Sequence, residues 1–186
     1  MTEKTEALVL RMSPFSRTSH MVTWLTADFG RITTMLKGSC RPKSIFLGQF
    51  DLCYTCELVF YSRGWNGVHI AKECVPLETR PVLRTDWRAA ACASYFCDIL
   101  SLVSAEDHAQ RELYELAVAA IDGLGLSTGA REQLLYWFEL RLAGLLGIRP
   151  QTAACVSCDA AVQPPYPAFF SASLGGALCE TCSRRR

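Results

Sequence analysis

Four cysteines near the C-terminal end form two Cys-x-x-Cys pairs, Cys155 with Cys158 and Cys179 with Cys182. Each pair can hold two thiolates on one side of a tight turn, and two such turns complete a tetrahedron around one metal ion. The segment between the pairs is rich in Pro, Ala and Gly and has too few large apolar residues for a core of its own. The spacing therefore predicts one structural Zn²⁺ ion, with no coordination position left for a catalytic water.

Two disulfides, or an iron ion held by four thiolates, are the alternatives that this spacing leaves open. The first residues carry charges ahead of any apolar run, which is unlike a secretory signal. Charged residues interrupt every apolar run before it reaches the length of a membrane span. We therefore expect a reducing, cytoplasmic environment without membrane contact, which favours thiolate ligands over disulfides.

Residues 1–78 contain short apolar runs separated by turn signals, a pattern typical of β-strands. The clearest alternation covers residues 50–61, where the even positions are apolar. Other strands are expected over residues 7–12, 20–26, 31–36 and 68–75, with a hairpin turn at Asn66-Gly67 before the last of them. Five short strands in such a segment predict a five-stranded OB-fold barrel.

The pattern becomes helical after residue 78. Helices are expected over residues 87–103, over 110–124, and from a cap at Ser127 or Thr128 to about residue 146. Their apolar stripes and short connections predict a bundle. The predicted class is α+β, with an OB-fold domain over residues 1–78, a helical domain over 79–150, and a zinc knuckle over 151–186 packed on the helical domain.

Charge is distributed unevenly, although the net charge is only +1. Residues 11–43 hold six basic residues and one acid, whereas residues 77–150 hold seven basic and ten acidic residues. Lys37, Arg41 and Lys43 lie on one Gly- and Pro-containing loop, which could follow a phosphate backbone without sequence preference. A solvated surface loop is the alternative. Arg17 and Arg31 could extend the same basic face.

Three segments resemble the RecO family, namely Glu6 to Leu10, Leu25 to Gly30 and, most specifically, Lys37 to Ser44. The order of barrel, helical region and four-cysteine knuckle also matches that family. The resemblance implies a DNA repair and recombination mediator of the bacterial cytoplasm and nucleoid with one structural Zn²⁺. It implies binding of single- and double-stranded DNA and annealing of complementary strands. It also implies action with RecR to load RecA onto DNA covered by single-strand-binding protein.

The resemblance and the charge pattern together make five residues candidates for nucleic-acid binding: Arg17, Arg31, Lys37, Arg41 and Lys43. Within the matching loop, Cys40 stands where family members often carry a second arginine. The chain stops four residues after Cys182, whereas family members usually continue with further helices.

No catalytic constellation is visible in the sequence. The three histidines are scattered, and no phosphate loop or nucleophile motif occurs, so we expect a protein that is not an enzyme. The competing function is a protein-interaction scaffold with little intrinsic DNA affinity. Cys53 and Cys56 form a third Cys-x-x-Cys pair, but on an extended strand their side chains would point to opposite faces, which disfavours a metal or redox role. Cys92 and Cys97 are expected to be small buried residues of a helix.

Overall fold

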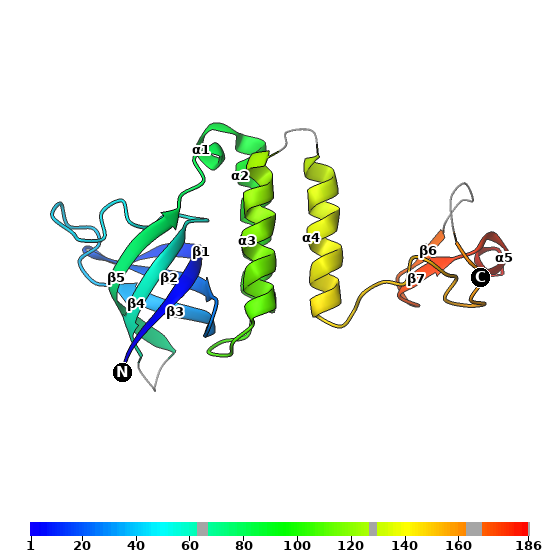
Figure 1. The fold of residues 1–186 in the computed structure, drawn as a ribbon, viewed down its shortest axis with the longest axis horizontal. Helices are drawn as coiled ribbons and strands as arrows, with labels where there is room; N and C mark the ends of the chain where they lie inside the picture. Colours follow the sequence, from blue (N-terminus) through cyan, green and yellow to red (C-terminus); the bar gives the residue numbers. More distant parts are fainter. Residues whose placement is uncertain (63–66, 127–129, 163–168, 186) are drawn as a thin grey trace. The chain divides into compact units, whose positions relative to one another are not determined.

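A computed structural model of the chain describes residues 1–62, 67–126, 130–162 and 169–185 (Figure 1). Asn66 of the predicted hairpin turn and the predicted caps Ser127 and Thr128 lie outside the described residues. Internal contacts divide the chain into two compact units, Met1–Leu135 and Tyr136–Arg186. The predicted α+β class is confirmed, whereas the predicted domain boundaries after residues 78 and 150 stay predictions.

The first unit contains a closed barrel of five strands. They are β1 (Thr2–Ser16), β2 (Ser19–Thr26), β3 (Gly30–Leu36), β4 (Thr55–Tyr61) and β5 (Val68–Glu78). The order around the barrel is β1-β2-β3-β5-β4, and β1 closes it by pairing antiparallel with both β2 and β4. The pairing of β3 with β5 is parallel. This is an OB-like barrel, so the five-stranded prediction is confirmed.

The barrel core follows the period-two pattern of the sequence. Side chains along β3 alternate between buried and half-buried, as expected for strands with one face on a core. Trp24, Leu58 and Phe60 are among the largest fully buried side chains. The indole Nε1 of Trp24 donates to Oγ1 of Thr34 at 2.8 Å, which satisfies a polar atom that would otherwise be costly to bury.

Two strands differ most from the prediction. The strand expected from Phe50 begins only at Thr55, because residues 51–54 form a turn. In that turn Cys53 has a φ of 63°, and the amide of Tyr54 donates to the Asp51 carbonyl at 3.0 Å. Phe50 and Tyr54 still pack against the barrel core, which explains why this stretch imitates a strand pattern. Strand β1 is much longer than predicted, with register shifts that let it bend between two neighbours.

The predicted helices are present as α2 (Trp87–Val103), α3 (Arg111–Leu126) and α4 (Arg131–Leu145), preceded by the single turn α1 (Val82–Thr85). Helix α2 begins after Asp86, whose side chain accepts from the amides of Arg88 and Ala89. A hydrogen bond from Arg131 holds the pKa of the Asp86 carboxyl below its usual range. Helices α2 and α3 pack together, and α4 crosses the division between the two units.

Arg80 joins the barrel to helix α3. Its side chain is only 5% exposed, and its Nε donates to Oδ1 of Asp122 at 2.7 Å. Its Nη1 donates to the Cys53 carbonyl at 2.7 Å and to Oγ1 of Thr55 at 2.9 Å. A buried guanidinium is tolerated when its charge is paired, and Asp122 supplies the opposite charge here. These bonds therefore fix α3 against the end of the barrel where β4 begins.

Gly30 allows the connection between α2 and α3 to approach the start of β3. Its φ is 67°, and a Cβ built there would lie 2.0 Å from the His108 carbonyl oxygen. We expect Gly30→Ala to lower the free energy of unfolding, measured in urea, by on the order of 3 kcal/mol or more.

Gly48→Ala is the matched control for that substitution. Gly48 has a φ of 73° but no atom within 4 Å of a built Cβ. The free energy of unfolding of Gly48→Ala should therefore fall by only ~1 kcal/mol, which is the cost of holding an alanine in the left-handed conformation. Equal losses in the two variants would contradict the close approach of His108.

The second unit ends in small elements around the cysteines: β6 (Phe169–Ser171), β7 (Gly176–Leu178) and α5 (Glu180–Ser183). Strands β6 and β7 pair antiparallel. Within the described ranges, no helix combines the length and the apolar character that crossing a lipid bilayer would require.

Candidate metal site and nucleic-acid interface

The four predicted metal ligands come together in the second unit. The Sγ atoms of Cys155, Cys158, Cys179 and Cys182 all lie within 4.8 Å of one another. Those of Cys158 and Cys179 are 3.7 Å apart. When four thiolate sulfurs surround one zinc ion tetrahedrally at ~2.3 Å, any two of the sulfurs are about 3.8 Å apart. The cluster could therefore hold one tetrahedral metal ion, and its donor set suits zinc or iron.

Backbone hydrogen bonds build the cysteine cluster from two separate segments. The amide of Val156 donates to the Ala177 carbonyl at 2.9 Å, which ties the first Cys-x-x-Cys turn to β7. The backbone amides of Cys179, Ser157 and Cys158 donate to the Cys155 sulfur and lower the pKa of its thiol to about 6, although burial acts in the opposite direction. Cys155 is therefore prepared as the thiolate that a metal requires.

Four of the five predicted nucleic-acid residues gather at one end of the barrel: Arg17, Lys37, Arg41 and Lys43. Arg17 lies in the turn between β1 and β2, and the other three lie in the loop after β3. The loop is bonded to that turn, since the amide of Cys40 donates to the Thr18 carbonyl at 3.1 Å. The amide of Gly38 also donates to Oγ of Ser19 at 3.2 Å. We call these four residues the basic end of the barrel.

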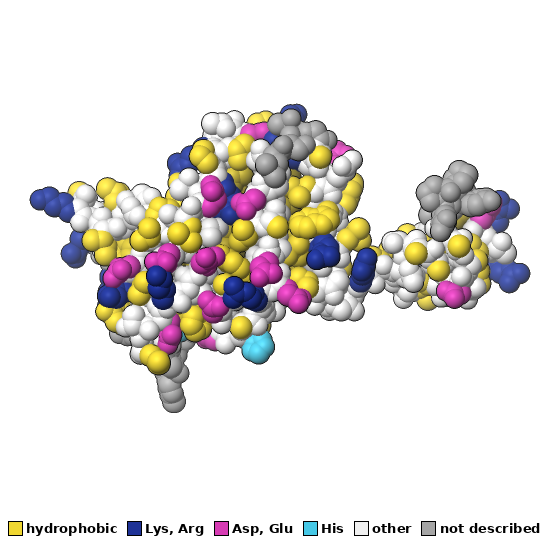
Figure 2. Space-filling model, in the orientation of Figure 1, with side chains coloured by type: hydrophobic (Ala, Val, Ile, Leu, Met, Phe, Trp, Pro, Cys, Tyr) yellow, Lys and Arg dark blue, Asp and Glu magenta, His cyan; other side chains and the backbone are white. Residues whose placement is uncertain are grey.

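The four side chains of the basic end are all exposed. Among the described residues, none of the ion pairs involves any of them. In Figure 2, Lys and Arg side chains project from the left end of the barrel, and acidic side chains lie further along it and over the helices. A group of cations on one surface attracts phosphates, and with no acidic partner among the described residues no ion pair has to be broken first.

Arg31 does not belong to this group. It stands at the start of β3, whereas Lys37 follows the end of that strand. Six residues of extended chain separate the two by roughly 20 Å. The Arg31 guanidinium pairs with Glu106 at 2.9 Å, and its Nε donates to the Ser104 carbonyl at 3.3 Å. These contacts give Arg31 a role in holding the end of α2 against the barrel, and DNA contact by Arg31 stays an untested prediction.

Sequence reasoning missed the apolar side chains beside the basic end. Phe15 is 60% exposed, close to Arg17 in the chain, and Ile45 and Leu47 are 70% and 64% exposed just after Lys43. Proteins that bind single-stranded nucleic acid use exposed aromatic side chains beside cations to stack on the bases. The available signal was the pair Pro14-Phe15 between the strands predicted over residues 7–12 and 20–26.

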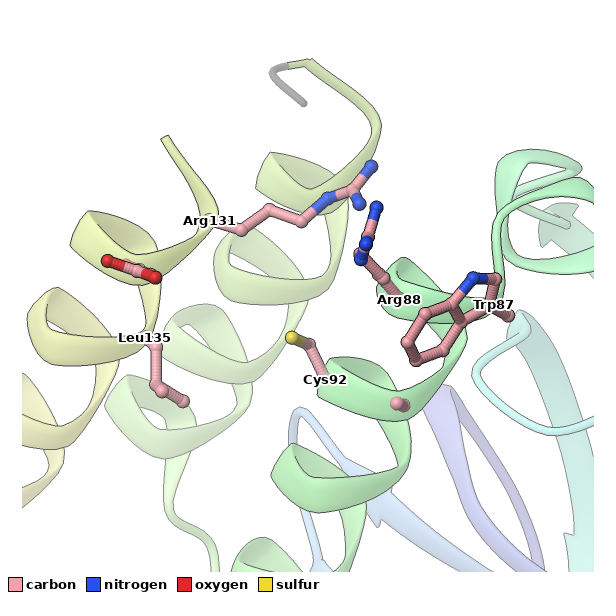
Figure 3. A pocket seen from close by; sticks show the side chains of 7 residues that line it. Trp87, Arg88, Cys92, Arg131 and Leu135 are labelled. Atoms are coloured by element: carbon pink, nitrogen blue, oxygen red, sulfur yellow. The ribbon is translucent and has the colours of Figure 1, made fainter. Parts of the chain in front are cut away.

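A cavity of about 570 Å³ lies between α2 and the first turn of α4. Trp87, Arg88 and Cys92 line it from α2, and Arg131 and Leu135 from α4 (Figure 3). Trp87 is 72% exposed, and the guanidinium carbon of Arg88 lies 5.0 Å from the centre of its ring system. The cavity thus places an aromatic surface beside the Arg88 guanidinium, whereas Arg131 is paired with Asp86 and Glu132 adds a negative charge to the wall. Cys92, which was expected to be buried, is only half-buried at its wall.

Four of the other cysteines are buried, in two separate environments. Cys56 and Cys74 belong to the barrel core, and each sulfur lies 3.5 Å from the Gln49 carbonyl oxygen. Cys53 faces the helices, where its sulfur is 3.5 Å from that of Cys97. The expected separation of Cys53 from Cys56 is therefore found, although a turn rather than a strand produces it.

Comparison with known proteins agrees with this architecture. The family described as Recombination protein O N terminal matches residues 1–80, and the one described as Recombination protein O C terminal matches residues 84–186. The DNA repair protein RecO of Desulforudis audaxviator is 31% identical over 182 residues, which cover 98% of this chain and 71% of that protein.

Two further relatives carry the same name. The protein of Rhodopirellula baltica is 32% identical over 95% of this chain and 65% of its own length. That of Syntrophus aciditrophicus is 28% identical over 97% of this chain and 70% of its own length. The chain thus spans 65% to 71% of these relatives.

The fold and the cysteine cluster define a class of α+β proteins in which an OB-like barrel is followed by helices and a four-cysteine knuckle that could hold a metal ion. Within that class, the two family matches together cover nearly the whole chain. The chain belongs to the RecO family of DNA repair proteins.

Proposed function

We propose that this RecO-family protein binds single- and double-stranded DNA through the basic end of its barrel. The observation that carries the proposal is the gathering of Arg17, Lys37, Arg41 and Lys43 on two bonded loops, exposed and without acidic partners among the described residues. Such a surface contacts phosphates, which are present at every nucleotide, and so binds strands without reading their sequence. Phe15 adds an aromatic face for unstacked bases.

Annealing of complementary strands follows from the same surface without a catalytic group. Cations that neutralise phosphates on two strands lower their mutual repulsion and raise the local strand concentration. Base pairing then selects the correct partner. In the cell, this activity would operate with RecR to load RecA onto DNA covered by single-strand-binding protein, in the bacterial cytoplasm and at the nucleoid. Membership of the RecO family supports this part of the proposal.

Zinc is the metal that we assign to the four-cysteine cluster. Four thiolates complete the tetrahedral coordination that structural zinc sites use. With every ligand supplied by cysteine, the ion would hold the two chain segments together and take no part in chemistry. Metal analysis by mass spectrometry of the purified protein should find one zinc ion per chain. Stoichiometric iron, or disulfides between these cysteines, would contradict the assignment.

The annealing rate of two complementary labelled oligonucleotides, followed by fluorescence over a salt series, tests the proposed function. We expect acceleration at low salt that falls steeply as salt rises, because each phosphate contact releases condensed counterions. A logarithmic slope of affinity against salt of about −3 corresponds to four contacts on a single strand. No acceleration by folded, metal-loaded protein in dilute buffer would contradict the proposal.

A non-catalytic interaction scaffold is the second candidate, and the cavity beside Trp87 favours it. An exposed tryptophan beside the Arg88 guanidinium, at the mouth of a cavity, is a surface suited to a partner that inserts an apolar side chain. A pull-down experiment should measure how well this protein captures RecR or the tails of single-strand-binding protein, and DNA binding should be measured on the same preparation. Strong capture without DNA affinity would favour the scaffold over DNA binding.

A further inference from the structure

The thiols of Cys53 and Cys97 lie against each other in the interior of the first unit. Their sulfur atoms are 3.5 Å apart, and each residue is 1% exposed. Cys53 belongs to the turn before β4 and Cys97 to α2, so the pair connects the barrel with the helices. A disulfide bond of ~2.05 Å would require the sulfurs to approach by only about 1.5 Å.

A buried guanidinium lies beside this pair. Arg80 donates from Nη1 to the carbonyl oxygen of Cys53, whereas its Nη2 is buried without a hydrogen-bond partner among the described residues. A buried donor without an acceptor is rare and costly. A positive charge so placed would stabilise a thiolate on the neighbouring cysteine.

The two thiols are unequal. The hydrogen bond with Cys97 lowers the pKa of the Cys53 thiol, with a further contribution from Arg80 and against the effect of burial. The pKa of Cys97 is raised by the hydrogen bond with Cys53 and by burial. Cys53 is therefore the more nucleophilic member of the pair, and Cys97 is the thiol that stays protonated.

A small cavity leads to Cys53. Its volume is about 150 Å³, and its walls include Cys53, Arg80 and the α2 residues Ala90, Ala93 and Ser94. Because a water molecule takes up ~30 Å³, a small peroxide fits in this space. A buried sulfur beside such a cavity can react with small oxidants while larger reagents are excluded.

We infer that Cys53 and Cys97 form a dithiol that peroxide converts to a disulfide. The Cys53 thiolate attacks one oxygen of hydrogen peroxide, the O–O bond breaks, and a sulfenic acid and, after proton uptake, water are formed. The Cys97 sulfur then attacks the sulfenic sulfur, the S–O bond breaks, and the departing hydroxide takes up the Cys97 proton. Two thiols and one peroxide thus give one disulfide and two waters, with the thiols oxidised and the peroxide reduced.

The disulfide would tie the turn before β4 covalently to α2. It would close a loop between positions that are 44 residues apart, and a cross-link over such a loop restricts the unfolded chain strongly. Oxidation would therefore stiffen the joint between barrel and helices. The inference does not depend on DNA binding, because neither thiol belongs to the basic end and the readouts below need no DNA.

Peptide mapping of the zinc-loaded full chain after treatment with hydrogen peroxide tests the inference. We expect a cross-link between the tryptic peptide with Cys53 and the one with Cys97, reversed by dithiothreitol. The midpoint of thermal unfolding should rise on the order of 5–10 °C. Cys97→Ala should abolish this cross-link, and Cys92→Ala, on the same helix and in the same peptide, should retain it.

Oxidation of Cys53 to the sulfinic acid without a cross-link would overturn the inference. Cross-links confined to Cys56 and Cys74, or to the four-cysteine cluster, would also overturn it. The map of the wild-type protein decides the question even where a variant folds poorly, since fragment ions distinguish Cys53 from Cys56.

Discussion

Replacing Cys179 by serine should release the metal and unfold the knuckle, while the first unit stays folded. From residue 151 onward, the buried apolar side chains among the described residues are those of Cys155, Ala177 and Leu178. So small a core does not offset the entropy of ordering this segment. Structural zinc contributes ~10–16 kcal/mol in comparable knuckles, so loss of one thiolate should weaken binding by about 100-fold or more.

Amide hydrogen exchange with metal analysis measures this effect. The amides of Cys155 and Val156, which donate to the carbonyls of Ala160 and Ala177, should lose their protection in Cys179→Ser. Amides of the barrel strands should keep theirs. Cys92→Ser serves as the control, because Cys92 is a cysteine outside the cluster. Full metal content and unchanged protection in Cys179→Ser would contradict the assignment of this ligand.

Reversing three charges of the basic end should nearly abolish binding of single-stranded DNA. The variant replaces Lys37, Arg41 and Lys43 by glutamate, which removes three phosphate contacts and introduces repulsion. We expect the affinity at low salt to fall by about 100-fold or more. The slope of log affinity against log salt should become shallower by about 2, since each single-strand contact contributes ~0.7.

The matched control replaces Arg141, Arg149 and Arg185 by glutamate. These three side chains are also exposed, and none of them takes part in an ion pair among the described residues. Both variants change the net charge equally. A difference in DNA affinity between them therefore reports where the charges lie and not how many there are. Fluorescence anisotropy should show near-wild-type affinity for the control. Equal losses would mean that net charge, and not the basic end, governs binding.

The sequence predicted those parts of the fold that local periodicity determines. The apolar spacing of α2 and α3 depends on neighbouring residues, and the observed boundaries of these helices agree within two positions; the predicted end of β4 also agrees. The turn at residues 51–54 was wrongly predicted as strand, because Phe50 and Tyr54 pack on the core from irregular backbone. The left-handed conformation of Cys53 depends on tertiary contacts, which override the local preference of a non-glycine residue.

The candidate sites show the same limit. The four-cysteine cluster could be predicted because a Cys-x-x-Cys turn is a local structure. The closeness of Arg17 to the loop after β3, the ion pair of Arg31 with Glu106, and the contact of Cys53 with Cys97 all join distant parts of the chain. Charge pattern alone placed Arg31 with the basic face, since it cannot distinguish the two ends of one strand.

Photo-cross-linking of a single-stranded oligonucleotide containing 5-iodouracil, followed by peptide mapping, tests the central claim most directly. Our account predicts cross-links within residues 13–21 and 37–47, which carry the basic end and Phe15. Their yield should fall as salt rises. Cross-links confined to α3 or to residues 151–185 would contradict the claim that the barrel holds DNA through these loops.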